Sequence, residues 1–107
     1  MTRSLLLASL LAATALATSS AHAAGDKEAG RLKTYTCHGC HGVPGYKNAY
    51  PNYHVPRIAG QHYEYLVAAL KAYQTGDRDH PTMRAQGESL SAQDIEDIAA
   101  YLAGLAP

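Results

Sequence analysis

Two cysteines and a histidine at a fixed, short spacing constrain this chain more than any other feature. Residues 37–41 read Cys-His-Gly-Cys-His, which is the pattern C-x-x-C-H. Two thiols three residues apart can add across the two vinyl groups of a haem, and the imidazole directly after the second thiol reaches the iron from the same side. The motif therefore predicts that Cys37 and Cys40 bind a haem covalently and that His41 faces its iron.

The same five residues are compatible with two other kinds of site. A C-x-x-C pair also occurs in thiol–disulfide exchange proteins, but no alternation of strand and helix patterns surrounds this one. The chain has two cysteines in all, which excludes a four-cysteine zinc site. A Cys₂His₂ zinc site would need His54, His62 or His80, and the spacing departs from the zinc-finger pattern. Haem attachment is favoured over both, and His38 is interpreted as an exposed filler between the cysteines.

The first 23 residues have the pattern of a secretory signal peptide. Arg3 supplies a short positive region, residues 5–17 are almost wholly apolar, and residues 21–23 (Ala-His-Ala) have the form of a cleavage site. We predict a signal peptide over residues 1–23 and a mature chain over 24–107, with an uncleaved N-terminal anchor as the alternative. The apolar run is short for a bilayer span, so no transmembrane segment is expected in the mature chain. Export would place the chain in an oxidising compartment, the periplasm.

Charge and aromatic content limit the class of protein further. Without Arg3, eight Lys and Arg residues stand against nine Asp and Glu residues, so the mature chain is near neutral. This balance gives no support to a nucleic-acid binder. The chain has 8 Tyr, no Trp and no Phe, so tyrosines are the only large aromatic side chains that could surround a haem. A mature chain of this size buries a small core, which a cofactor would complete.

Three helices joined by ordered loops are predicted for the mature chain. The first runs from Asp26 or Lys27 into the cysteine motif, with Asp26 as a candidate N-cap residue. Its core-facing residues are predicted to be Ala29, Leu32 and Tyr35 or Thr36. Residues 42–60 contain three prolines and three glycines without a helical period, and they are expected to form a long loop wrapped on the cofactor.

The second and third helices follow from their apolar periodicity and their end signals. The second is indicated by Tyr63, Leu66, Leu70 and Tyr73. Gly76 stands where this helix should stop, and residues 77–90 are predicted to be a second loop. Ser91 and Asp94 form a capping box for the third helix, which is expected to end at Gly104. Its apolar face consists of Ile95, Ile98, Leu102 and Leu105.

A second axial ligand for the iron has few candidates in this sequence. After removal of the signal peptide Met83 is the only methionine, and it follows Pro81 in the predicted second loop, off the face of any helix. A thioether in the sixth position would raise the reduction potential relative to two histidines. His80 and His54 are the alternative ligands, and the alternative role for Met83 is that of a gap-filling core residue.

With these motifs in place, the mature chain resembles a class I c-type cytochrome over residues 26–107. More closely it resembles a single-haem unit of the cytochrome c4 and c553-like group. The stretches that carry the resemblance are Cys37-His38-Gly39-Cys40-His41-Gly42, Pro56-Arg57-Ile58-Ala59-Gly60-Gln61-His62-Tyr63-Glu64-Tyr65-Leu66, Met83 with Leu90-Ser91 and Asp94-Ile95, and Ala99-Ala100-Tyr101-Leu102. The resemblance implies an all-α fold, the small cytochrome c fold, with about three helices and ordered loops around one haem.

By this resemblance each functional residue acquires a role. Cys37 and Cys40 would form the thioethers, His41 would be the proximal ligand of the iron and Met83 the distal one. The backbone carbonyl of Pro56 would accept a hydrogen bond from His41 and fix its tautomer. Cytochromes c4 carry two such units in tandem, whereas this chain has one C-x-x-C-H motif, so one haem c is expected per chain.

The function implied is outer-sphere electron transfer, without catalysis. The partners would be periplasmic or membrane-bound redox proteins such as a dehydrogenase or an oxidase. One alternative is the cytochrome subunit of a periplasmic dehydrogenase, of the flavocytochrome sulfide dehydrogenase type or from an alcohol-oxidising complex. Another is a ligand-binding, sensing or peroxidase-like haem protein, which would need an open sixth position. Arg57 lies in the loop on the proximal side, where its guanidinium could reach a haem propionate.

Overall fold

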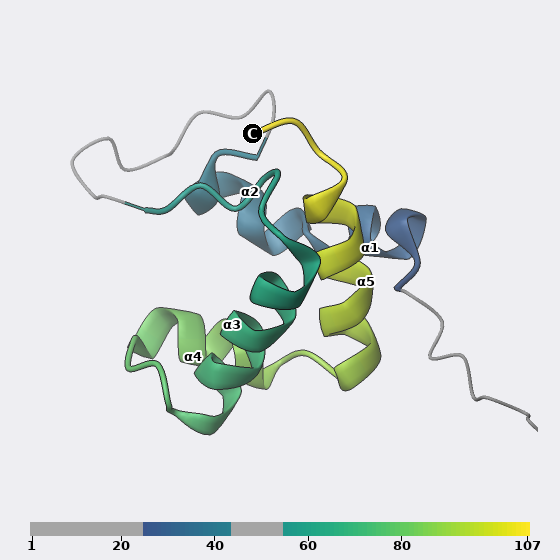
Figure 1. Cartoon of the computed structure of the whole chain (residues 1–107). Helices are drawn as coiled ribbons and strands as arrows, with labels where there is room; N and C mark the ends of the chain where they lie inside the picture. The colour runs from purple at the N-terminus through teal and green to yellow at the C-terminus, as the bar shows by residue number, and fades with distance from the viewer. Residues whose placement is uncertain (1–24, 44–54) are drawn as a thin grey trace, which may run out of the picture.

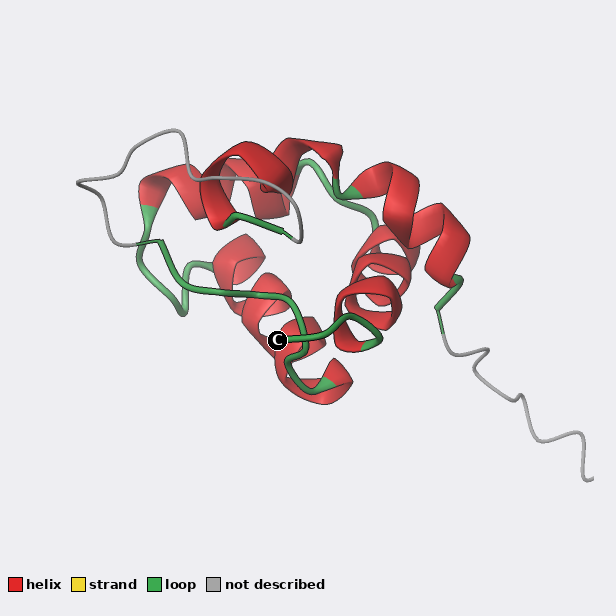
Figure 2. Cartoon of the chain, turned by 90° about the horizontal axis from the view of Figure 1, so that it is seen from above, coloured by secondary structure: helices red, strands yellow, loops and turns green. Residues whose placement is uncertain are grey.

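The computed structural model describes residues 25–43 and 55–107, and over these ranges all regular secondary structure is helical (Figures 1 and 2). The helices are α1 (Lys27–Lys33), α2 (Tyr35–His41), α3 (Tyr63–Thr75), α4 (Pro81–Glu88) and α5 (Ala92–Ala103). The all-α expectation is confirmed. Five helices replace the three predicted, because the first predicted helix is two helices and α4 lies where a loop was expected. The predicted signal peptide, His54 and most of the first loop lie outside the described residues.

No helix in the described ranges combines the length and the apolar character needed to cross a bilayer.

Helix α1 packs against α5 (Figure 1). The two helices meet at Gly30, which lies against the backbone of Asp97. Asp26 is the N-cap of α1, as predicted, and its carboxylate accepts hydrogen bonds from two backbone N–H groups of the first turn. A Cβ on Gly30 would collide with the carbonyl oxygen of Asp97 and lie 2.9 Å from Cβ of Tyr101. The missing side chain therefore sets how closely the two helices approach.

Asp97 is buried at this crossing, with 2% of its surface exposed. Its carboxylate accepts hydrogen bonds from Nζ of Lys33 at 2.6 Å, from Nε2 of Gln93 at 2.8 Å and from the backbone N–H of Asp26 at 2.8 Å. The Lys33 bond above all lowers the pKa of Asp97. Because the folded-state pKa is the lower one, this stabilisation is present above the unfolded aspartate pKa of about 4 and is lost as pH falls through the folded value.

Replacing Gly30 by alanine is expected to lower the free energy of unfolding by roughly 1–3 kcal/mol, because the new methyl group meets backbone that cannot rotate away. Denaturant unfolding of the haem-loaded protein measures this change. Gly39→Ala is the matched control, since a Cβ on Gly39 has no atom within 4 Å. An unfolding midpoint for Gly30→Ala equal to that of the control would show that the crossing tolerates a side chain.

The first predicted helix differs from expectation in both length and core face. Thr34 separates α1 from α2, is fully buried, and donates its hydroxyl hydrogen bond to the carbonyl of Arg31 at 2.9 Å. Leu32 and Tyr35, predicted in the core, are 60% and 75% exposed. The face that packs on α5 carries the small residues Gly30 and Thr34, so close helix approach and not side-chain size decided which face is buried.

Helices α3 and α5 match the prediction closely. Gly76 ends α3 in the left-handed conformation, with φ 83°. Ser91 and Asp94 form the capping box of α5, with both hydrogen bonds present. The buried residues of α5 include Ile95, Ile98 and Leu102. Leu66 of α3 joins Ile98 and Leu102 in one hydrophobic cluster, against which Leu105 packs from beyond the helix end.

Helix α4 corrects the prediction of a loop over residues 77–90. Pro81 occupies its first turn, and His80 is its N-cap, with Nδ1 accepting a hydrogen bond from the backbone N–H of Met83 at 3.2 Å. Proline is favoured in a first helical turn, because its missing N–H has no intrahelical partner there. Met83 therefore lies in the first turn of a helix, where the sequence predicted a loop.

Polar contacts to α3, together with one small buried residue, hold α4 in place. Nε2 of Gln74 donates hydrogen bonds to the carbonyl oxygens of Gly87 and Leu90, both at 2.8 Å. Gly87 is buried against the side chains of Tyr73 and Gln74. This attachment does not depend on an apolar stripe, so hydrophobic periodicity does not reveal the helix.

Candidate haem-binding site

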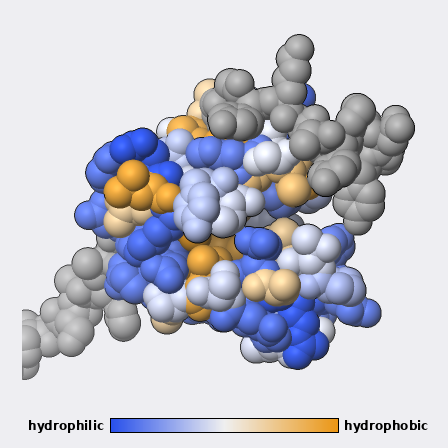
Figure 3. Space-filling view, turned by 180° about the vertical axis from the view of Figure 1, so that it is seen from behind, coloured by the Kyte–Doolittle hydropathy of each residue, from blue (hydrophilic) through white to orange (hydrophobic). Residues whose placement is uncertain are grey.

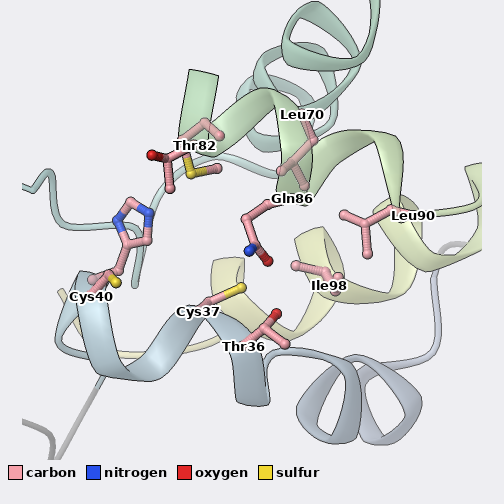
Figure 4. Close-up of a pocket in the computed structure, with 10 residues that line it drawn as sticks. Thr36, Cys37, Cys40, Leu70, Thr82, Gln86, Leu90 and Ile98 are labelled. Atoms are coloured by element: carbon pink, nitrogen blue, oxygen red, sulfur yellow. The ribbon is translucent and has the colours of Figure 1, made fainter. Parts of the chain in front are cut away.

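A cavity of about 560 Å³ lies between α2, α3, α4, α5 and the segment that precedes α3. This volume falls within the range of cofactor pockets, roughly 300–1,000 Å³. Its walls are largely apolar and include Ile58, Leu66, Leu70, Ile98 and Leu102. A smaller cavity of about 70 Å³ shares Cys37, Leu70 and Ile98 with it and continues toward Thr36, Gln86 and Leu90 (Figure 4).

The C-x-x-C-H motif forms the α2 wall of the cavity. Cys37, Cys40 and His41 all line it, and both cysteines are free thiols. Residues three and four apart share one face of a helix, which is why α2 can turn both thiols and the imidazole toward one space. Figure 4 shows the Cys37 sulfur pointing into the cavity. Gly42 then ends α2 in the left-handed conformation, with φ 58°.

The environment of Cys37 argues against a redox dithiol. Burial raises the pKa of the Cys37 thiol above its ordinary value. Thiols that perform disulfide exchange have lowered pKa values, because the thiolate is the reacting form. The Cys37 environment therefore does not favour a thiol–disulfide exchange protein.

The zinc alternative also finds no support in the structure. The described residues contain no group of three or more His, Cys, Asp or Glu residues that could hold a metal ion. His62 is exposed at the start of α3. His38, between the cysteines, is half-buried, and its Nε2 lies 3.2 Å from the Thr34 hydroxyl, so it is not the exposed filler that was predicted.

His41 is oriented by a backbone carbonyl. Its Nδ1 lies 2.7 Å from the carbonyl oxygen of Pro56, which also lines the cavity. A carbonyl can only accept, so Nδ1 carries the proton in this hydrogen bond and Nε2 keeps its lone pair. A metal-ligating histidine is commonly oriented in this way, with its second nitrogen hydrogen-bonded to a carbonyl or carboxylate.

Met83 and its rival His80 both line the same cavity as His41. Nδ1 of His80 is the acceptor that caps α4, and its ring meets the Tyr73 ring edge-on, with centroids 6.5 Å apart. His54 lies outside the described residues. The structure thus brings Cys37, Cys40, His41, Pro56 and Met83 to one cavity and gives His80 a capping contact within it.

Two arginines differ in their position relative to the cavity. Arg57, whose guanidinium could reach a haem propionate according to its place in the sequence, has an exposed side chain and is not among the residues that line the cavity. Arg78 lines the cavity instead, together with Tyr65. Gly76 is the sequence feature from which the position of Arg78 could have been predicted, because the helix stop at Gly76 reverses the chain. In the reversed chain the backbone N–H of Arg78 donates a hydrogen bond to the Ala72 carbonyl at 3.1 Å.

The fold and the site together define a helical protein built to hold a covalently attached haem. The chain belongs to the cytochrome c family, since the family model described as cytochrome c matches residues 27–106. Cytochrome c4 from Pseudomonas aeruginosa is 44% identical over 98 residues, which cover 92% of this chain and 47% of that protein. Cytochrome c4 from Stutzerimonas stutzeri is 43% identical over 93 residues, covering 78% of this chain and 43% of that protein.

Cytochrome c-554(548) from Halomonas halodenitrificans is 43% identical over 81 residues, covering 73% of this chain and 94% of that protein. The chain spans about half the length of the two cytochrome c4 relatives. As a member of this family the protein carries covalently attached haem c with iron, and its two cysteines are available for the attachment.

The residues of the cavity fit this cofactor. Apolar walls suit a macrocycle, two free thiols share the α2 wall, and the hydrogen bond to Pro56 leaves Nε2 of His41 able to bind a metal. A thioether sulfur, that of Met83, lines the same space.

Proposed function

We propose that the protein is a periplasmic electron carrier with one haem c, which passes single electrons between redox partners by outer-sphere transfer. The observation that carries this proposal is the presence of His41 and Met83 on the walls of one cavity, together with both thiols of α2. Two protein ligands would fill both axial positions of the iron. A carrier needs no open position, because no substrate binds to the metal.

In this proposal each residue has a separate task. Cys37 and Cys40 form the thioethers, and His41 binds the iron through Nε2, held in that tautomer by the carbonyl of Pro56. Met83 supplies the sixth ligand from the first turn of α4. The haem supplies reversible one-electron chemistry. The apolar walls exclude water and, with the axial thioether, favour the reduced state.

Carbon monoxide tests whether the sixth position is closed. The reduced, unmodified protein is expected to keep its visible spectrum on addition of carbon monoxide at neutral pH, because Met83 occupies the only site where the gas could bind. Spectra of the oxidised and reduced protein with and without the gas measure this. A rapid spectral change at stoichiometric gas would contradict the carrier and favour the ligand-binding or peroxidase-like alternative.

The partner is proposed to be a periplasmic or membrane-bound dehydrogenase or oxidase. Two more distant relatives support a redox enzyme: one from Thiomonas intermedia is named thiosulfate dehydrogenase electron acceptor, and one from Chlorobaculum tepidum is named cytochrome subunit of sulfide dehydrogenase. On the face seen in Figure 3, hydrophobic surface is broken into small patches among hydrophilic residues. Small, transient interfaces of less than about 1,200 Å² suit such a surface and permit fast release.

The relative from Chlorobaculum tepidum also supports an alternative proposal, in which this chain is the cytochrome subunit of a dehydrogenase. The two proposals differ in how the partner is held. A free carrier elutes alone at high ionic strength, whereas a subunit stays with one larger chain in a fixed ratio.

A further inference from the structure

Arg78 stands out in the composition of the cavity walls. Among the described residues that line either cavity it is the one lysine or arginine, and no aspartate or glutamate lines them. None of the ion pairs formed within the described ranges includes Arg78. A guanidinium without a carboxylate partner therefore borders a space with almost no other formal charge.

Three contacts hold Arg78 at this wall although its side chain is exposed to solvent. Its backbone N–H donates to the carbonyl of Ala72 at 3.1 Å, and Nη1 donates to the hydroxyl of Tyr65 at 3.4 Å. Its Cζ lies 4.8 Å from the centre of the Tyr73 ring, a cation–π contact. A free surface arginine would extend into water, so this arrangement keeps the positive charge beside the cavity.

The chemistry of the cofactor indicates what meets this charge. Haem carries its vinyl groups on one edge and its two propionates on the opposite edge. The cysteines that take the vinyl groups lie on α2, whereas Arg78 lies in the connection between α3 and α4. Figure 1 shows α2 and that connection on opposite sides of the molecule. We propose that Arg78 is the counter-ion of a haem propionate, with the Tyr65 hydroxyl beside it; this inference rests on the proposed function.

Arg57 provides the matched comparison. It carries the same charge and was the residue favoured by sequence position, but it does not line the cavity. Its backbone carbonyl accepts a hydrogen bond from Nε2 of Gln61 at 2.7 Å, a contact that a side-chain substitution leaves intact. Arg78→Gln therefore removes one positive charge from the cavity lining. Arg57→Gln removes the same charge from a residue that does not line the cavity.

Arg78→Gln is expected to lower the reduction potential. A positive charge near the haem opposes the oxidised, more positive form, so its removal favours oxidation. We expect the equilibrium between reduced and oxidised protein to shift roughly three- to tenfold, where a tenfold shift is about 59 mV for a one-electron couple. Arg78→Lys keeps the charge and is expected to retain most of the potential, while Arg57→Gln changes it little, because Arg57 does not line the cavity.

The experiment measures three quantities on the haem-loaded variants: haem content, the reduction potential by spectroelectrochemical titration, and the propionate-bending band in resonance Raman spectra. The proposal expects Arg78→Gln alone to shift both the potential and the Raman band, with full haem content. Equal potentials for Arg78→Gln and Arg57→Gln, or an unshifted Raman band, would overturn the assignment while leaving the electron carrier intact. Absence of covalent haem from the unmodified protein would overturn the proposed function and this inference together.

Discussion

Changing both Cys37 and Cys40 to alanine is expected to abolish covalent haem retention, and each single change is expected to weaken it. Each thiol forms one thioether, so a single variant keeps one bond and the double variant keeps none. Acid–acetone extraction separates the two cases, because it removes haem that is held only by axial ligands and contacts. The double variant should lose all its haem colour to the solvent, and the unmodified protein should lose none.

His38→Ala is the control for these variants, because it changes a residue between the same two cysteines without removing a thiol. It is expected to retain its haem after extraction, because both thiols remain, although the contact between His38 and Thr34 is lost. Extraction of haem from the unmodified mature protein would refute thioether attachment at Cys37 and Cys40.

The second large effect is expected at Met83. Met83→Ala should abolish the weak near-red absorption that marks sulfur bound to ferric haem, and it should lower the reduction potential, because a thioether ligand favours the ferrous state. The expected fall is well above the roughly 59 mV that corresponds to a tenfold change in a one-electron equilibrium. A redox titration and a ferric spectrum measure both quantities.

His80→Asn tests whether His80 binds the iron or serves only as the N-cap of α4. Asparagine is a strongly preferred N-cap residue, so it can replace the contact from His80 to the backbone N–H of Met83 while removing the imidazole. This variant is expected to keep the near-red band. Absence of the near-red band from the unmodified protein, with a reduction potential that changes in His80→Asn but not in Met83→Ala, would transfer the distal role to His80.

The parts of the fold that short-range chemistry determines could be predicted from the sequence. The capping box of Ser91 and Asp94 and the stop at Gly76 depend on residues within one turn of the helix end. The apolar face of α5 follows from its period, because that face meets the interior over its whole length. Cys37, Cys40 and His41 share a wall because residues three and four apart lie on one face of an α-helix.

The parts that depend on distant contacts could not be predicted. Gly30 and Thr34 look unremarkable as core residues, yet they form the buried face of α1, because a carbonyl of α5 approaches Gly30 too closely for a side chain. Hydrophobicity alone favoured Leu32, which is exposed. Helix α4 was missed because its anchor is an amide of α3. Arg78 was missed because its position depends on how the chain reverses after Gly76.

The contact between Asp97 and the backbone of Asp26 joins residues 71 positions apart in the chain. Such a contact closes a long loop. The entropic cost of closing this loop is offset only when α1 and α5 have packed together. Ile98 and Leu102, which line the cavity, belong to α5, whereas the cysteine motif lies on α2, directly after α1. Before α1 and α5 have met, the chain therefore has thiols and an imidazole but lacks the α5 wall beside them. The residues that capture the cofactor are close together in the sequence, whereas the wall that shields it from water depends on a contact between distant parts of the chain.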